Sequence, residues 1–171
     1  MKILHFYRTY YPDSFGGVEQ VIRQLVTATT QLGVNAEVLT LTRNKQQLDI
    51  EFEGHRVYRA PLNFEIASTG FSWAALSKFK RLAAQADIIH YHFPWPFMDL
   101  AHFLCGIKKP SIVTYHSDIV RQKQLLKIYQ PLKRKFLRHV DRIVATSPNY
   151  MASSGILNSF RDKTEVITYG L

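Results

Sequence analysis

The chain contains almost no cysteine: Cys105 is its single representative among 171 residues. An internal disulfide is therefore excluded, and with it the stapled frameworks of small secreted domains. This usage is typical of a reducing compartment, so we expect a cytoplasmic protein. Because Cys105 lies in an apolar run, we expect an inert buried thiol rather than a reactive one.

Long hydrophobic runs are also missing. The most apolar stretch, from Trp95 to Ile107, is interrupted by Asp99 and His102 and is too short to cross a bilayer. The sequence starts directly with a strand-like segment, so we expect no signal peptide. It shows no internal repeat and no low-complexity tract. With 46% apolar and 20% charged residues, it indicates a soluble globular protein that fits one domain.

Acidic residues are scarce relative to basic ones: 13 against 22, for a formal net charge of +9. This balance favours an anionic partner, which can be nucleic acid, a phosphorylated substrate or an anionic lipid surface. Eight basic residues and one acid lie between Arg121 and Arg142. Four of them fall within about 60° on a continuous helix: Lys123, Lys127, Arg134 and Arg138.

Two interpretations fit this basic face. It is either a solvated helix face or, together with aromatic residues elsewhere in the chain, an attachment site for an anionic membrane surface. In the first case the aromatic residues belong to the core, and in the second they lie at an interface. The residues concerned are Phe71, Trp73, Phe93, Trp95 and Phe97.

Strand-like and helix-like segments alternate along the chain in the pattern of βαβ units. Strands are predicted at Lys2–Tyr7, Ala36–Thr42, His55–Ala60, Asp87–His92, Ser111–His116, Arg142–Thr146 and Glu165–Thr168. Helices are predicted from Val18 towards a stop at Gly33 and at Phe71–Ala84, Pro96–Gly106, Leu125–Val140 (with a break or a new first turn at Pro131) and Pro148–Leu157. The polar segment Thr42–Gly54 is expected to be a loop. The pattern predicts an α/β fold with a Rossmann-like, doubly wound parallel sheet of about seven strands and helices on both faces.

Gly16 and Gly17 stand between the first predicted strand and the first predicted helix. Paired glycines at this place let backbone N–H groups approach a phosphate closely, and the helix dipole adds about half a positive charge. The same pair also fits a simple tight turn. The motif therefore needs support from its surroundings.

Polar and titratable residues follow the predicted strands at their carboxyl ends, where open α/β sheets bind ligands. They are Tyr10, Asp13, Gly16 and Gly17 after the first strand, His90 and His92 at the fourth, His116, Ser117 and Asp118 at the fifth, and Ser147 after the sixth. His90 and His92 face the same side of their strand. They fit packing with a hydrogen bond, a contact to a bound sugar, or a metal site with His116, which no nearby carboxylate completes.

Three segments in order resemble the retaining, GT-B-fold glycosyltransferases of family 4: Gly16–Glu19, Asp87–His92 and Thr114–Asp118. Glu165–Leu171 resembles the segment where the family's N-terminal domain passes to its C-terminal domain, although Thr168 and Tyr169 replace the usual Pro-Asn-Gly turn. The resemblance covers essentially the whole chain. It implies that residues 1–171 form the N-terminal, acceptor-side half of a GT-B fold and that the C-terminal, nucleotide-sugar-binding domain is absent from this chain. The chain alone is then expected to be inactive.

The resemblance also implies an activity: transfer of a sugar, with retention, from a nucleotide sugar to a saccharide or lipid-linked acceptor in glycan or cell-envelope polysaccharide synthesis. Gly16 and Gly17 would bind the donor diphosphate, and His116 and Asp118 would be catalytic. The residues expected at the acceptor are Tyr10, Glu19, His90, His92 and Ser147. The C-terminal domain of the same protein would be a partner, and no metal or other cofactor is expected. Attachment to the inner face of the cell membrane follows only from the second interpretation of the basic face.

Each of these roles has a structural alternative. His116 can be a strand-end histidine without a chemical role, Asp118 can cap the following helix, and Glu19 can be a solvated first-turn carboxylate.

Other function classes are less well supported. A nicotinamide-dependent oxidoreductase would need Gly-x-Gly-x-x-Gly after the first strand and an acid after the second, where Thr40 and Thr42 stand instead. A non-catalytic nucleic-acid or anion-binding domain would explain the charge, but no recognised nucleic-acid module appears, so we expect no nucleic-acid partner. A metal hydrolase would be revealed by a metal that survives dialysis.

Overall fold

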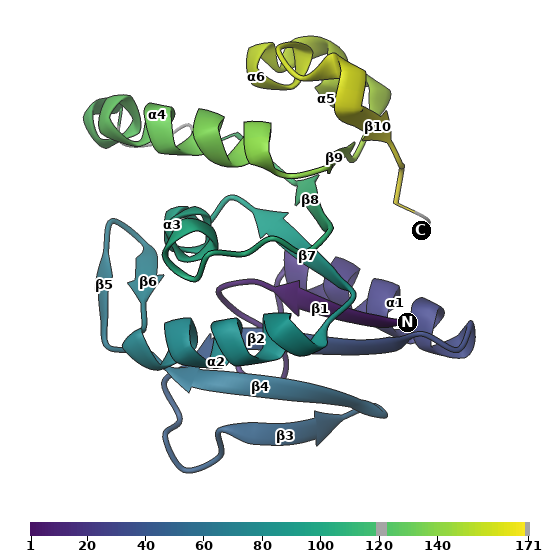
Figure 1. Ribbon diagram of the computed structural model, residues 1–171, viewed down its shortest axis with the longest axis vertical. Coiled ribbons are helices and arrows are strands. Elements are labelled where there is room, and N and C mark those ends of the chain that lie inside the picture. The colour runs from purple at the N-terminus through teal and green to yellow at the C-terminus, as the bar shows by residue number, and fades with distance from the viewer. Residues whose placement is uncertain (119–122, 170–171) are drawn as a thin grey trace.

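A central sheet of eight strands organises the chain (Figure 1). The structure is a computed structural model and describes residues 1–118 and 123–169. The strand order is β10-β9-β8-β7-β1-β2-β4-β3, and neighbours are parallel except β3 and β4. The strands are β1 Lys2–Phe6, β2 Asn35–Thr42, β3 Asp49–Phe52, β4 His55–Pro61, β7 Ile88–Phe93, β8 Ser111–Tyr115, β9 Arg142–Ala145 and β10 Thr164–Val166. The predicted doubly wound α/β fold is confirmed, with eight strands in place of seven.

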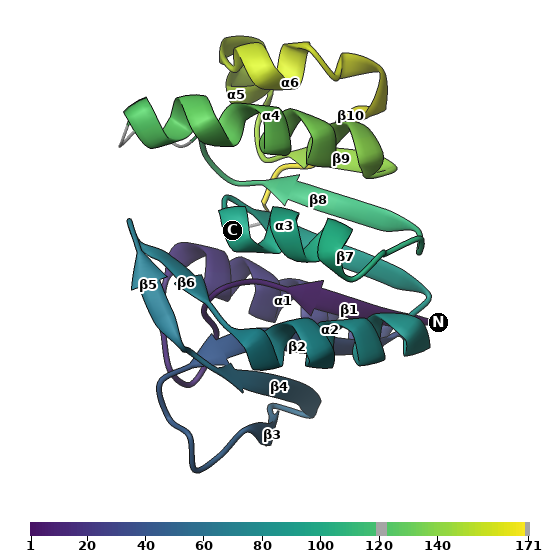
Figure 2. The same ribbon diagram turned by 60° about the vertical axis from the view of Figure 1, so that its left-hand side comes forward.

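Helices cover both faces of this sheet, as predicted. They are α1 Gly17–Gln31, α2 Trp73–Gln85, α3 Pro96–Leu104, α4 Lys123–His139, α5 Pro148–Ser153 and α6 Gly155–Asn158. Figure 2 shows α1 on one face and α2 on the other. On the α1 side, Ile22 and Val26 pack with residues of β2 and β4. The larger core lies on the opposite side, where α2, α3 and α4 contribute Phe79, Phe97 and Phe136.

β1 shows how one strand serves both cores. Its side chains alternate between faces, and Leu4 and Phe6 belong to the core beneath α2 and α3. His5 points to the α1 side and is buried. β1 pairs with β7, and His5 lies opposite His90 in this pair. A polar ring in this strand therefore meets the histidines of β7.

The polar segment predicted as a loop contains a strand, which corrects the expectation for Thr42–Gly54. β3 runs antiparallel to β4 and forms the edge of the sheet. The two strands are joined by Glu53 and Gly54, both at positive φ (46° and 79°), as a type I′ turn requires. β3 reads as polar because alternate side chains of an edge strand face solvent.

A second departure is a small hairpin of β5 Phe64–Ile66 and β6 Thr69–Phe71. Phe71 belongs to this hairpin, so the helix predicted from Phe71 begins at Trp73 instead. Ser72 caps it, because its hydroxyl accepts a hydrogen bond from the Ala75 N–H at 3.1 Å. The hairpin is held to the domain by Trp95, whose indole N–H donates to the Gly70 carbonyl at 3.1 Å.

Three further predictions are corrected by the helices and the core. α4 runs through Pro131 as one helix, without the predicted break. The helix predicted at Pro148–Leu157 is two helices separated at Ser154, which caps the second. The aromatic rings that were candidates for an interface include three that are buried in the core: Phe93, Trp95 and Phe97.

Cys105 lies half-buried, and its thiol donates a hydrogen bond to the Leu76 carbonyl at 3.4 Å. Burial raises the pKa of this thiol, which agrees with the expectation of an inert group. Within residues 1–118 and 123–169, no helix is long and apolar enough to cross a membrane.

Candidate functional site

The segment between β1 and α1 ends with Gly16 and Gly17, and we call it the glycine loop. It leads from the carboxyl end of β1 directly into α1. Gly16 is the N-cap of α1 and, having no side chain, makes no capping hydrogen bond. The first N–H groups of a helix have no partner within the helix itself. The first N–H groups of α1 can therefore bind an anionic group, as the sequence pattern suggested, while the carboxylate of Glu19 lies against Gly16 beside them.

The two glycines serve different purposes. Gly16 has an ordinary extended backbone, with φ −99°, so its conformation does not demand glycine. A Cβ atom at Gly16 would collide with the carboxylate of Glu19, whereas one at Gly17 would meet nothing within 4 Å. Gly16 is needed for internal packing, and Gly17 leaves free space in front of the loop.

Glu19 is buried, with 5% of its surface exposed, so the interpretation as a solvated first-turn carboxylate is wrong. Its Oε1 atom accepts a hydrogen bond from the Ser14 hydroxyl at 2.6 Å. Its negative charge acts on His116, where it raises the pKa against the larger effect of burial. Glu19 thus links the glycine loop to the end of β8.

His116 lies directly after β8, partly buried, and its backbone N–H donates to the Phe93 carbonyl at 3.1 Å. Burial lowers the pKa of His116 to about 4. The ring is therefore neutral near pH 7, with one nitrogen as donor and the other as acceptor.

Three imidazoles form a continuous row that leads from His116 into the domain. The His116 Nε2 and His92 Nδ1 atoms are 3.1 Å apart, and the His92 Nε2 and His5 Nδ1 atoms are 3.0 Å apart. At the outer end, the Tyr169 hydroxyl is hydrogen-bonded to His116 Nδ1. We call His116, His92 and His5 the histidine chain. Burial is also the main cause that lowers the pKa of His5 and His92 well below the usual range.

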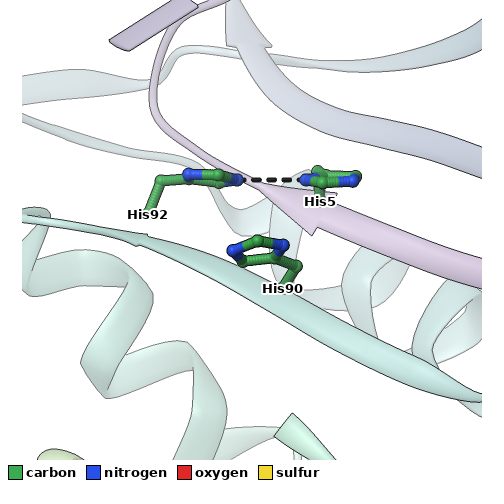
Figure 3. A group of neighbouring side chains, drawn as sticks. All are labelled: His5, His90 and His92. Carbon is green, nitrogen blue, oxygen red and sulfur yellow. Dashed lines mark hydrogen bonds between the residues drawn. The ribbon is translucent and has the colours of Figure 1, made fainter. Parts of the chain in front are cut away.

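His90 stacks beside this chain. Its ring centroid is 4.5 Å from that of His92, at an interplanar angle of 18°, and its Nε2 atom pairs with the Thr114 hydroxyl at 2.8 Å. His5, His90 and His92 each place a nitrogen within 4.8 Å of the others (Figure 3). An imidazole lone pair lies in its ring plane, so stacked rings do not aim at one tetrahedral centre. The arrangement fits packing with a hydrogen bond better than a metal site.

Two predicted acceptor residues are unavailable to a ligand, and these predictions are contradicted. Tyr10 is completely buried in the core beneath α1, and its hydroxyl pairs with His55 Nε2 at 3.1 Å. His92 is also completely buried and uses both ring nitrogens in the histidine chain. A residue near the end of a strand can still point into the sheet.

Ser147 and Asp118 both have structural partners. Ser147 caps α5, accepting from the Tyr150 N–H at 3.1 Å. The Asp118 carboxylate accepts a hydrogen bond from the Tyr115 hydroxyl at 2.7 Å. Tyr115 belongs to the larger core, and the His116 ring is hydrogen-bonded to His92, so the described residues show no hydrogen bond between Asp118 and His116. The alternative in which Asp118 caps the next helix lies outside the described residues.

A cavity of about 570 Å³ lies beside the glycine loop. Its walls come from the segments after β1 and β2 and from the β5–β6 hairpin. The polar and charged lining residues include Arg8, Asp13, Ser14, Arg43, Asn44 and Glu65. The Arg8 guanidinium donates to the Ser68 carbonyl at 3.0 Å, and the buried Arg59 holds Asp13 at 2.8 Å. Leu41 and Leu62 also line the cavity, so its wall offers apolar as well as polar contacts.

The basic residues of α4 are exposed where the structure describes them. Lys127, Arg134 and Arg138 face solvent, and the Lys123 side chain lies outside the described residues. Ile128 adds an exposed apolar side chain, 79% of whose surface is accessible. This surface is compatible with both interpretations of the basic face.

Sequence reasoning missed His5, Arg8 and Arg43. In a doubly wound sheet the first strand lies beside the fourth. This strand order would have placed His5 next to the histidines of the predicted fourth strand. Arg8 and Arg43 follow the first and second strands and fall under the same carboxyl-edge rule. Their contribution to a cavity depends on the hairpin, for which the sequence pattern gave no signal.

The sequence model of Glycosyltransferase Family 4 matches residues 15–170 of the chain. D-rhamnosyltransferase WbpZ of Pseudomonas aeruginosa is 55% identical over 171 residues, which are 100% of this chain and 45% of that protein. O-antigen chain mannosyltransferase C of Escherichia coli is 52% identical over the same length, 46% of its own. The chain thus spans less than half the length of these curated relatives.

Solved structures resemble the whole chain at lower identity. Sucrose-phosphate synthase from Thermosynechococcus elongatus matches with a TM-score of 0.69 and 18% identity, over 99% of this chain and 48% of that one. Anabaena Alr3699/HepE, solved in complex with UDP and glucose, matches with a TM-score of 0.68 and 16% identity, over 100% of this chain and 45% of that one. At this level of identity the likeness establishes a common fold.

Proposed function

The chain belongs to glycosyltransferase family 4, and on this basis we propose that it is the N-terminal, acceptor-side half of an enzyme of cell-surface polysaccharide synthesis. The observation that carries the proposal is the identity of more than half with a rhamnosyltransferase and an O-antigen mannosyltransferase along the whole chain. D-rhamnose is 6-deoxy-D-mannose, so the sugars in the names of the two relatives have the same ring configuration and differ only at carbon 6. We propose a nucleotide-activated mannose or rhamnose as donor. The activity is that of the full-length protein.

The donor diphosphate is proposed to bind at the glycine loop. The uncapped N-terminus of α1 offers backbone N–H groups, and the space in front of Gly17 is open. A phosphate oxygen gains both from these donors and from the helix dipole. The rest of the nucleotide sugar would be held by the C-terminal half of the full-length protein.

The proposed reaction forms a bond between an acceptor hydroxyl oxygen and the anomeric carbon and breaks the bond from that carbon to the diphosphate. The acceptor proton passes to the departing phosphate oxygen. When attack occurs on the face from which the diphosphate leaves, configuration is retained and no protein nucleophile is needed. The protein then acts by positioning both substrates and stabilising the leaving group.

His116 is the residue of this half that we propose to contact the transferred sugar. It lies at the carboxyl edge of β8, is joined electrostatically to Glu19 and thus to the glycine loop, and carries a neutral ring. A neutral imidazole can exchange a hydrogen bond with a sugar hydroxyl. We assign no chemical step to Asp118, because its carboxylate is engaged by the Tyr115 hydroxyl.

The acceptor saccharide is proposed to occupy the cavity beside the glycine loop. Ser14 lines this cavity and also donates to Glu19, which supports a position beside the proposed donor site. Hydroxyl, amide, carboxylate and guanidinium groups in its wall match the alternating donors and acceptors of a sugar. An acceptor at this place can present a hydroxyl towards the donor.

For a lipid-linked acceptor, the enzyme must work at a membrane surface. We propose that Lys127, Arg134 and Arg138 attach the protein to anionic lipid at the cytoplasmic face of the membrane, with Ile128 as an apolar contact. This attachment would bring the acceptor cavity to its substrate without a membrane-spanning helix.

Transfer by the full-length protein tests the proposal. The protein is incubated with radiolabelled UDP-, GDP- and dTDP-linked sugars and with lipid-linked saccharide from a bacterial membrane extract. We expect label to enter the lipid fraction from a mannose or rhamnose donor. The variant His116→Ala should lose most of this transfer while His139→Ala, an exposed histidine at the end of α4, retains it.

Two results would overturn the proposal. Equal transfer by His116→Ala and wild-type protein would remove His116 from the site. No transfer from any donor to an acceptor extract that a related mannosyltransferase does use would reject the proposed activity. In that case, salt-dependent binding of oligonucleotides would test the nucleic-acid alternative.

A further inference from the structure

The histidine chain is uncharged and comes from β1, β7 and the residue directly after β8, and the proposed chemistry at His116 uses only its outermost ring. His5 comes from β1 and His92 from β7, and both rings have almost no access to solvent. A buried histidine destabilises the folded state unless its ring nitrogens have hydrogen-bond partners. The chain pairs four of the six ring nitrogens with one another, so its members are best understood as a unit.

In a row of neutral imidazoles the positions of the protons are coupled. Each ring carries one N–H donor and one bare acceptor nitrogen. His92 bonds to His5 through Nε2 and to His116 through Nδ1. If His92 donates to His116, it must accept from His5, and if it donates to His5, it must accept from His116. The three rings therefore carry their protons either all on Nδ1 or all on Nε2.

The inner end of the chain distinguishes these two patterns. His5 Nε2 is buried and has no hydrogen-bond partner among the described residues. With all protons on Nε2, the chain would end in a buried N–H without an acceptor. With all protons on Nδ1, it ends in a bare lone pair. Buried N–H groups without partners are the rarer of the two in proteins, which favours the second pattern.

We propose that His5 and His92 are positioning residues that hold His116 as its Nδ1–H tautomer, so that His116 presents a hydrogen-bond donor to the substrate. His5 donates to His92, and His92 donates to His116 Nε2. The remaining proton of His116 then points out of the chain. In the structure this Nδ1 atom is hydrogen-bonded to the Tyr169 hydroxyl, which a ligand oxygen would have to replace.

A fixed donor limits what His116 can do. Its Nδ1–H can bind a sugar hydroxyl oxygen or an oxygen of the leaving diphosphate, but it cannot remove a proton from the acceptor. Burial keeps all three rings neutral, because it lowers their pKa values. The inference rests on the proposed role of His116 and specifies it as a donor.

The position of the proton can be read directly by NMR. The full-length protein is labelled with ¹⁵N in histidine, and the signals of His116 are assigned with His116→Gln. We expect a protonated, pyrrole-type nitrogen at Nδ1 and an unprotonated, pyridine-type nitrogen at Nε2. In His92→Phe, which keeps a ring but removes both nitrogens, the His116 signals should become the average of two tautomers.

Transfer kinetics supply the functional readout. For His92→Phe we expect kcat to fall by about 10- to 100-fold, with a smaller change in KM for the donor, because the substrate still binds but meets a misoriented ring. His102→Phe is the matched control. His102 is also a buried histidine paired with another, His139, but it lies in the opposite core, so its loss should leave the His116 signals unchanged.

The proposal is overturned if wild-type His116 carries its proton on Nε2, if it exchanges between tautomers, or if His92→Phe leaves a fixed Nδ1–H tautomer. The wild-type spectrum decides the first two points, so the test survives a variant that fails to fold. Full transfer by His116→Ala would instead end the proposed role of His116 in the reaction. The NMR and kinetic arms thus separate the two failures.

Discussion

Gly16 and Glu19 are in such close contact that the carboxylate of Glu19 fills the space that a side chain at residue 16 would need. A Cβ atom at Gly16 would lie 3.0 Å from the carboxyl carbon of Glu19 and closer still to one oxygen. Gly16→Ala must therefore displace a buried carboxylate from its bond to Ser14. We expect a loss of about 1–3 kcal/mol in unfolding free energy, the usual cost of overpacking, measured by urea denaturation.

The neighbouring glycine should behave in the opposite way. A methyl group at Gly17 meets no protein atom within 4 Å, so Gly17→Ala should leave the urea midpoint essentially unchanged. The same methyl occupies the space proposed for the donor diphosphate, and KM for the nucleotide sugar in the full-length protein should rise about tenfold. If Gly17→Ala transfers sugar with wild-type KM, the diphosphate does not approach this side of the loop.

Arg59 and Asp13 support the wall of the cavity that we propose for the acceptor. The guanidinium of Arg59 is 1% exposed and bonds to Asp13 at 2.8 Å, so Asp13→Ala leaves a buried charge without its carboxylate. We expect a loss of about 2 kcal/mol, since Asp13 is partly exposed and water can replace it in part. The surface pair Arg23–Glu53 is the control, and Glu53→Gln should change the urea midpoint little. Equal effects of the two variants would contradict the structural role of Asp13.

The overall fold could be predicted because buried parallel strands are continuous apolar runs. The segments that became β1, β7 and β8 carry this signal within a residue or two of their ends. β3 could not be recognised, because half of its side chains face solvent at the sheet edge. The β5–β6 hairpin turns at Ala67 and Ser68, both at positive φ, whereas such turns are normally signalled by Gly or Asn.

The sequence predicts at which edge of the sheet the candidate site lies, but not which of the residues there are buried. The carboxyl-edge rule places Gly16, Gly17 and His116 at the edge of the sheet where β1 and β8 end. It could not tell that Tyr10 is buried, because the partner of its hydroxyl, His55, begins a strand far along the chain. The histidine chain depends on the register between β1 and β7, which local pattern does not contain.

The pH dependence of stability should follow from six histidines that burial keeps neutral: His5, His55, His90, His92, His102 and His116. Their pKa values are lowered from 6.5, and three of them to about 4. Between about pH 4 and pH 6.5, these histidines bind protons in the unfolded chain but not in the folded one. Unfolding free energy should therefore rise with pH through this window and be fully developed above pH 6.5.

One buried carboxyl group opposes this trend. Burial raises the pKa of Asp99 well above 3.8, so folded Asp99 keeps a proton that the unfolded chain releases. The histidines outnumber it, and each proton is worth about 1.4 kcal/mol per pH unit. Urea midpoints measured across the window should fall on acidification, and His102→Gln should reduce the slope. A stability that is constant across the window would show that these rings are not kept neutral by folding.

The exposed basic residues of α4 should control binding to anionic membranes. Lys127, Arg134 and Arg138 project from one helix face, and charges near a membrane surface add to binding individually. Replacing all three by Gln should weaken co-sedimentation of the full-length protein with phosphatidylglycerol vesicles by about 100-fold at low salt. Binding to phosphatidylcholine vesicles should be weak for both proteins.

A control with equal loss of charge separates a specific face from general attraction. Lys80, Arg81 and Lys108 are also exposed but lie on α2 and before β8. Their triple replacement by Gln lowers the net charge as much and should leave vesicle binding nearly intact. If the two triple variants lose binding equally, attraction follows from the net charge of +9 and not from α4. The basic face would then be a solvated helix surface, and the acceptor would have to reach the cavity by another route.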